Sequence, residues 1–267
     1  MDDGARHSVE VRFLGCFSLT VNGSPIRQWR AGKARNLFQY LVLNKDQLVT
    51  RDQLYDALWP ESEFPGGSSL KVAAHALRRV LQAHPDRPGD TGISIVYRDF
   101  GYSIHIEDFG SDVEEFQRLV SDGLRAHRAG DAERTDRSLR AALGLYSGEF
   151  LPGESAAWVV EQREYLKSLA MRALDVVRAA AVTRDDFDDL IQVCRQTLGI
   201  DRYHEETYRV LMAAHGRRGE FDRARSWYEL CSRRLMEDLA VAPDRETERT
   251  LQRIIPRTRL APVRLAG

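Results

Sequence analysis

Ser68-Ser-Leu-Lys-Val-Ala-Ala-His-Ala-Leu-Arg-Arg-Val-Leu-Gln82 is the stretch that decides how this chain folds. It follows Pro65-Gly66-Gly67, and either of its first two serines can cap a helix, so the sequence predicts a helix over residues 68–82. At about 100° per residue, one side of this helix is entirely apolar. That side holds Leu70, Ala73, Ala74, Leu77, Val80 and Leu81, and the other side holds Lys71, His75, Arg78 and Arg79.

The basic side of this helix points to a nucleic acid as its partner. No acidic residue occurs anywhere in the stretch. The major groove of DNA is wide enough for a helix and is lined by phosphates, so such a helix fits there. The same pattern also suits an ordinary amphipathic surface helix whose arginines are solvated, and the helix alone does not separate the two interpretations.

The flanking segments favour the DNA interpretation. Upstream, residues 9–13 and 17–21 alternate, Asn22-Gly23 is a strong hairpin signal, and residues 24–29 read as a return strand. A helix over residues 31–43 and a second helix from the capping box Thr50-Arg-Asp-Gln53 to Pro60 follow. Downstream, strands 93–97 and 102–106 flank a tight turn at 98–101. This order predicts an α+β winged helix-turn-helix with an N-terminal antiparallel sheet.

Two further groups of cations are candidate DNA contacts. Arg98 lies in the turn that becomes the wing, from which it can reach a phosphate or a narrow minor groove. Arg30, Lys33 and Arg35, together with Arg27, form an acid-free cluster at the start of the first helix, where phosphates bind well. A solvated surface role is an equal alternative for this cluster, and Arg98 is also compatible with a plain hairpin turn.

From Asp112 onward the strand signals stop and only helical patterns remain. Helices are predicted at 112–127, 135–146, 158–183, 187–199, 205–218, 221–239 and 246–254. Phe187 and Phe221 both follow turns and lie 34 residues apart, which is the tetratricopeptide period. We therefore expect three parts: a DNA-binding domain over residues 1–108, an all-α tetratricopeptide-like domain over 109–255, and a flexible tail over 256–267.

Composition narrows the remaining classes of protein. The net charge of −1 over 267 residues means that nucleic-acid binding must depend on local clusters. Cys16, Cys194 and Cys231 lack metal-ligand spacing, which indicates reduced thiols in a cytoplasmic protein, and no apolar run resembles a signal peptide or a membrane span. Ala31-Gly32-Lys33 lacks the other residues of a phosphate loop. We expect no cofactor, no metal and no catalysis.

Taken together, the two halves resemble the actinobacterial antibiotic regulatory protein family, in which an OmpR-type winged helix precedes a bacterial transcriptional activator domain. The resemblance rests on residues 48–59, 70–81 and 98–102, and in the second half on residues 146–152, Trp158, Arg163-Glu164 and residues 236–244. It implies an activator of a biosynthetic gene cluster that binds promoter direct repeats near the −35 region. It also implies recruitment of RNA polymerase holoenzyme and self-association on tandem sites.

Two other functions stay open at this point. The first is a helical-repeat adaptor whose winged helix binds protein, although such modules usually carry acids on the third helix and this one has none. The second adds a small-molecule sensor pocket in the repeats, which the sequence neither supports nor excludes.

Overall fold

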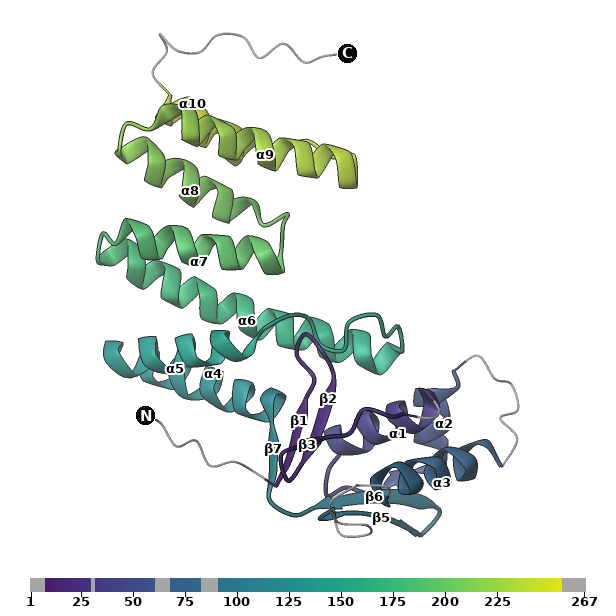
Figure 1. Cartoon of the computed structure of the whole chain (residues 1–267). Helices are drawn as coiled ribbons and strands as arrows, with labels where there is room; N and C mark the ends of the chain where they lie inside the picture. Colours follow the sequence, from purple (N-terminus) through teal and green to yellow (C-terminus); the bar gives the residue numbers. More distant parts are fainter. Residues whose placement is uncertain (1–7, 30–31, 61–67, 83–90, 256–267) are drawn as a thin grey trace.

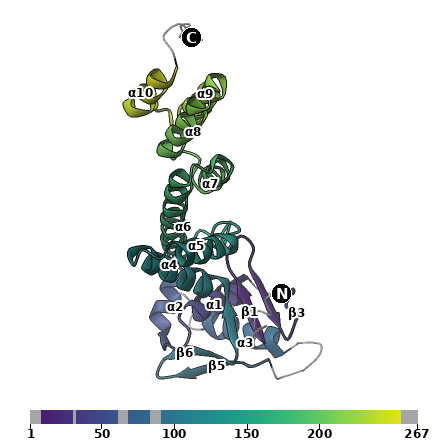
Figure 2. The same ribbon diagram turned by 90° about the vertical axis from the view of Figure 1, so that its left-hand side faces the viewer.

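The computed structural model describes residues 8–29, 32–60, 68–82 and 91–255. An α/β unit lies at one end of the molecule and a stack of helices extends away from it (Figure 1). The view turned by 90° shows the helices rising as a column above this unit (Figure 2). This arrangement confirms the predicted winged helix followed by a tetratricopeptide-like domain. The expected tail at 256–267 lies outside the described residues.

The chain opens with a four-stranded sheet in the order β3-β2-β1-β7. Its strands are β1 (Val9–Arg12), β2 (Ser18–Val21), β3 (Ser24–Pro25) and β7 (Phe109–Ser111). The predicted return strand is shorter than expected, since β3 ends at Pro25, a residue with no N–H to donate. β7 was not predicted, and it pairs in parallel with β1. A strand of three residues leaves no periodic signal in the sequence.

Three helices and a second sheet complete the α/β unit. The helices are α1 (Gly32–Leu43), α2 (Arg51–Leu58) and α3 (Ser69–Gln82). The predicted capping box starts α2: the Thr50 side chain accepts from the Gln53 N–H, and the Gln53 side chain accepts from the Thr50 N–H. The second sheet has the order β4-β6-β5, with β4 (Val49–Thr50), β5 (Ile93–Arg98) and β6 (Gly101–Ile106).

Seven helices form the second half, in close agreement with the periodicity of the sequence. They are α4 (Asp112–Arg128), α5 (Ala132–Leu145), α6 (Ala157–Thr183), α7 (Phe187–Ile200), α8 (Glu205–Arg217), α9 (Phe221–Leu239) and α10 (Arg245–Ile254). Neighbouring helices pack in pairs, and α10 covers α8 and α9. Cys194 and Cys231 are buried in these pairs, and burial raises their pKa values to about 11 and about 12, as suits inert packing residues. Cys16 is exposed.

The two halves share one apolar core. The Phe13 and Phe150 rings stack with centroids 5.6 Å apart, and Tyr40 meets Trp158 edge to face at 5.3 Å. Buried residues of both halves belong to one continuous cluster. The expected boundary at residue 108 falls between β6 and β7, so β7 belongs to the sheet of the first half although it follows the boundary. The 1–108 and 109–255 division therefore describes two sequence patterns that are joined by a shared sheet and core.

Asp112 is the main polar contact at this junction. It begins α4, and it is only 7% exposed. Its carboxylate accepts the backbone N–H of Phe13 at 2.9 and 3.0 Å and that of Leu14 at 2.9 Å. These two N–H groups lie just beyond the end of β1, where strand pairing no longer supplies an acceptor. The first residue of α4 thus completes the hydrogen bonding of the N-terminal sheet.

Gly101 allows β4 and β6 to approach closely, and this suggests a first test. A Cβ atom there would lie 2.6 Å from the Val49 carbonyl oxygen, and backbone does not yield as a flexible side chain would. We expect Gly101→Ala to lower the free energy of unfolding by about 1–3 kcal/mol, measured by urea denaturation. Gly144→Ala is the matched control, since no atom lies within 4 Å of the added Cβ and alanine favours a helix. Equal stability of Gly101→Ala and the wild type would contradict this account.

Candidate nucleic-acid interface

The face of α3 turned away from the core is basic, as the sequence predicted. All six apolar positions of the predicted arc are buried. Lys71, His75 and Arg79 are exposed, and within the described residues none of them makes an ion pair or hydrogen bond to the protein. Their charges are therefore available to a partner.

Val72 also lies on this exposed face, among the cations, and was not among the predicted site residues. Its side chain is 64% exposed, and His75 and Arg79 follow it by three and seven residues, on the same side of the helix. The exposed valine places an apolar group on an otherwise basic surface. The signal that points to it is a β-branched residue on the polar side of an amphipathic helix.

Arg78 lies at the edge of this face and not at its centre. It is half-buried, and its Nη2 donates to the Ile95 carbonyl oxygen of β5 at 3.0 Å. The contact ties α3 to the β5–β6 hairpin. Arg78 thus has a structural partner that the helical pattern does not show, and only its remaining N–H groups are left for DNA.

The β5–β6 hairpin forms the wing, and Arg98 is exposed near its tip. Two residues, Asp99 and Phe100, make the turn between the paired Arg98 and Gly101. The tip is held against α2, because the backbone N–H of Arg51 donates to the Phe100 carbonyl at 3.1 Å. Wing and α3 therefore lie at the same end of the molecule in a defined arrangement, as Figures 1 and 2 show.

The second predicted cluster is largely engaged within the protein. Lys33 donates to the Leu58 carbonyl oxygen, and its ammonium lies 5.4 Å from the centroid of the Trp59 ring. Arg35 forms an ion pair with Glu154 at 2.6 Å, from the start of α1 to the loop before α6. Arg30 lies outside the described residues. Contact of Lys33 and Arg35 with DNA stays a prediction, and for both the described geometry offers an internal role.

Two family models match the two halves of the chain. Residues 111–255 match the bacterial transcriptional activator domain, and residues 30–104 match the C-terminal domain of transcriptional regulatory proteins. The chain belongs to the bacterial transcriptional activator domain family. The combination of both domains also confirms the resemblance to the antibiotic regulatory proteins drawn from the sequence.

Individual relatives of this family are regulators from actinobacteria. The regulatory protein AfsR of Streptomyces coelicolor is 30% identical over 250 residues, which cover 86% of this chain and 23% of AfsR. The regulatory protein DnrI of Streptomyces peucetius is 27% identical over 150 residues, which cover 54% of this chain and 53% of DnrI. The chain thus spans less than two thirds of the length of either relative.

A solved structure has the same fold. It is Mycobacterium tuberculosis EmbR in complex with a low affinity phosphopeptide. It superposes with a TM-score of 0.68 at 23% identity, over 93% of this chain and 65% of that one. The winged helix and the helical stack therefore occur together in another member of this group of regulators.

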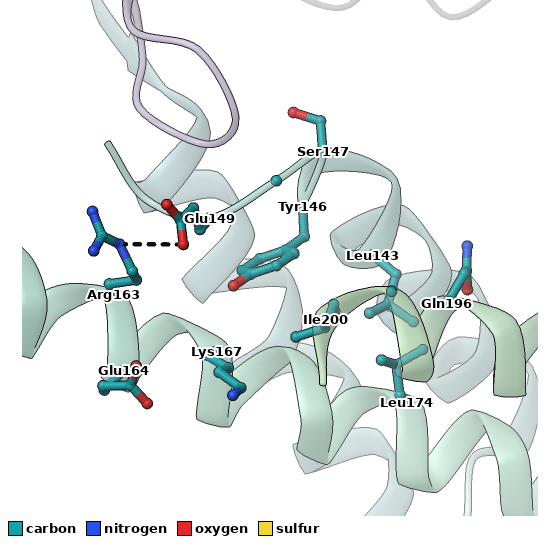
Figure 3. Close-up of a pocket in the computed structure, with 12 residues that line it drawn as sticks. Leu143, Tyr146, Ser147, Glu149, Arg163, Glu164, Lys167, Leu174, Gln196 and Ile200 are labelled. Carbon is teal, nitrogen blue, oxygen red and sulfur yellow. Dashed lines mark ion pairs between the residues drawn. The ribbon is translucent and has the colours of Figure 1, made fainter. Parts of the chain in front are cut away.

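The activator domain contains a cavity of about 470 Å³ between the end of α5, α6 and α7. Leu143, Leu174 and Ile200 lie on one side of it, with Arg163 and Glu149 on the other (Figure 3). Its cations already have partners. Arg163 donates to the carbonyl oxygens of Phe150, Leu151 and Glu154, and Lys167 lies 3.5 Å from Asp201. Desolvation, with nearby Glu149 and Glu164, raises the pKa of Tyr146 to about 12. This arrangement supports the loop between α5 and α6 and selects no ligand class.

Within the described residues, no group of three or more His, Cys, Asp or Glu side chains is placed to hold a metal ion. A search of the same residues for a helix long and apolar enough to cross a membrane also found none.

Proposed function

We propose that this chain is a sequence-specific DNA-binding transcriptional activator. The observation that carries the proposal is the exposed face of α3, where Lys71, His75 and Arg79 have no ion pair or hydrogen bond to the described part of the chain and no acid occurs within the helix. When this face is inserted in a major groove, its cations contact phosphates and base edges. These contacts offset the cost of removing the cations from water. Arg98 on the wing reaches the adjacent backbone or minor groove.

The two ends of the molecule are suited to different functions, DNA binding at one end and protein contacts at the other. The helical stack extends away from α3 and the wing, so bound DNA leaves its surface open (Figure 1). We propose that this surface serves self-association on promoter direct repeats near the −35 region and contact with RNA polymerase holoenzyme. By similarity to the antibiotic regulatory proteins, the target is a biosynthetic gene cluster, and the site of action is the cytoplasm.

The competing function is a helical-repeat adaptor whose winged helix binds protein. A basic face without acids disfavours it, because the partner would need a long acidic groove in place of DNA. Selection of bound sequences from a random DNA library by the full chain separates the two. Enrichment of one motif supports the activator, whereas no enrichment at low salt supports the adaptor. Transcription in vitro with purified polymerase on the selected promoter then tests activation.

Salt dependence provides a second expected result. If Lys71, Arg78, Arg79 and Arg98 each neutralise a phosphate, log affinity for a single site falls with log salt with a slope of about −4. Arg98→Ala then makes the slope less steep by about one unit. Arg118→Ala is the control, because Arg118 is an exposed arginine of α4 paired with Glu115 and far from this face, and it leaves the slope unchanged. A salt-independent affinity would contradict DNA binding through these cations.

Val72 yields a third expected result. An apolar side chain in the major groove recognises the C5-methyl group of thymine. Replacing one thymine of the selected site by deoxyuridine, which lacks that methyl, is expected to weaken wild-type binding about fourfold. Val72→Ala shows a smaller penalty, because it removes the two methyl groups that reach furthest from the helix. Alanine is also the better helix former, so folding is preserved. If replacing thymine by deoxyuridine weakens binding of the wild type and of Val72→Ala equally at every position, Val72 does not contact a thymine methyl group.

A further inference from the structure

The tip of the wing has a backbone conformation that its residues do not favour. Asp99 and Phe100 have φ values of 48° and 62°, in the left-handed region. A two-residue turn of this kind favours Asn-Gly or Asp-Gly, and a bulky residue with positive φ is an outlier that costs free energy. Glycine in place of Phe100 would relieve this strain.

No contact of the Phe100 ring within the described protein offsets the cost. The Phe100 side chain is 77% exposed, and among the ring contacts of the described residues it has none. Its only described hydrogen bond is made by its carbonyl oxygen, which any residue supplies. The strained backbone is held in this conformation by the strand pairing around it, that of β5 with β6 and of β6 with β4. The ring itself therefore contributes little to the folded state.

The Phe100 ring lies at the tip of the wing, next to the face of α3 that we propose binds DNA. Arg78 joins β5 to the edge of α3, and Arg51 holds the turn on α2, so the tip is carried at a fixed place beside the basic face. With α3 in a major groove, the wing lies over the neighbouring minor groove. Arg98, Asp99 and Phe100 are all exposed at the tip, and Phe100 is the one aromatic ring among these three residues.

We propose that Phe100 is an apolar wedge that enters the minor groove beside the α3 site, partly unstacks one base step and bends the DNA. This inference rests on the proposed function. Proteins that kink DNA insert such apolar side chains between base steps, and the cost is lowest at the flexible pyrimidine–purine steps TA and CA. The selected site is therefore expected to carry such a step on its wing side, at a position without direct hydrogen-bond readout.

The test uses the full chain and the site selected from the random library. Phe100→Asn keeps a residue that tolerates positive φ but removes the ring, and Phe100→Leu keeps an apolar wedge. Bending is measured by fluorescence energy transfer between the ends of the DNA, and unstacking by 2-aminopurine placed at the flanking step. Thermal unfolding of each variant confirms that it is folded. Phe100→Asn is expected to unfold at the same temperature as the wild type or higher.

The expected result is that Phe100→Asn binds roughly tenfold more weakly, loses the bend and the 2-aminopurine signal, and no longer prefers a TA or CA step. Phe100→Leu retains most of the bend. Tyr165→Ala is the control, because this residue of α6 is exposed and far from the wing, and its removal changes neither quantity. If Phe100→Asn bends and binds the DNA as the wild type does, the wedge proposal is overturned. The same holds if this variant loses only activation by polymerase. Failure of the full chain to enrich any DNA sequence would instead overturn the proposed function.

Discussion

Asp112→Ala is expected to lower the free energy of unfolding of the full chain by about 2–6 kcal/mol. The substitution leaves the N–H groups of Phe13 and Leu14 without an acceptor in a buried environment, and each such donor costs about 1–3 kcal/mol. The loss falls at the junction that both halves share. Urea denaturation followed by circular dichroism measures it, with the wild type in the same buffer as the reference.

Two further variants sharpen this test. Glu114→Ala is the matched control, because this acid lies in the same first turn of α4 but is exposed and pairs only loosely with Lys45, at 3.8 Å. It is expected to change stability by less than about 0.5 kcal/mol. Asp112→Asn keeps one acceptor and places an N–H₂ group against the same donors, so it recovers only part of the loss. If Asp112→Ala and Glu114→Ala are equally stable, the junction does not depend on this carboxylate.

Arg79→Ala is expected to have the largest effect on DNA binding among single substitutions in α3. Arg79 is exposed on the central part of the basic face and has no partner within the described protein. If it reads a base, its removal weakens binding by about 1–3 kcal/mol, which is roughly 5- to 150-fold, and relaxes specificity at one position. Fluorescence anisotropy with the selected site and its single-base variants measures both quantities.

Arg78→Ala provides the contrast. Because Arg78 also donates to the Ile95 carbonyl, its loss loosens the wing in addition to any loss of a DNA contact. We expect Arg78→Ala to reduce wing-dependent bending and thermal stability together, whereas Arg79→Ala leaves stability unchanged. Equal weakening of all DNA sequences by Arg79→Ala would assign it to a phosphate. Unchanged affinity in both variants would remove α3 from the groove.

The elements of the fold could be predicted because their signals are local. The helix predicted over residues 187–199 is α7 (Phe187–Ile200), and the apolar positions predicted for α3 are all buried. Thr50 and Gln53 form the capping box that their spacing indicates. Such signals depend on neighbours within one or two helical turns, and the sequence displays these directly.

The candidate site was predicted only in part. Helical spacing identified Lys71, His75 and Arg79 as one exposed face, and the structure places them so. It did not identify Val72 or Phe100, because hydrophobicity alone assigns such residues to a core. Nor did it show that Arg35 is paired with Glu154, since a cation in sequence carries no information about which carboxylate the folded chain brings to it.

By itself, the sequence determined the succession of strands and helices, the two fold types and the basic face of α3. Only the tertiary structure decided that both halves share a core, that Arg78 and Arg35 have internal partners, and that the Phe100 ring is exposed on the wing. The physical reason is the range of each interaction. Periodicity and capping act between residues a few positions apart, whereas Asp112 accepts the N–H of Phe13 across 99 positions, a pairing that exists only once the chain has folded back on itself.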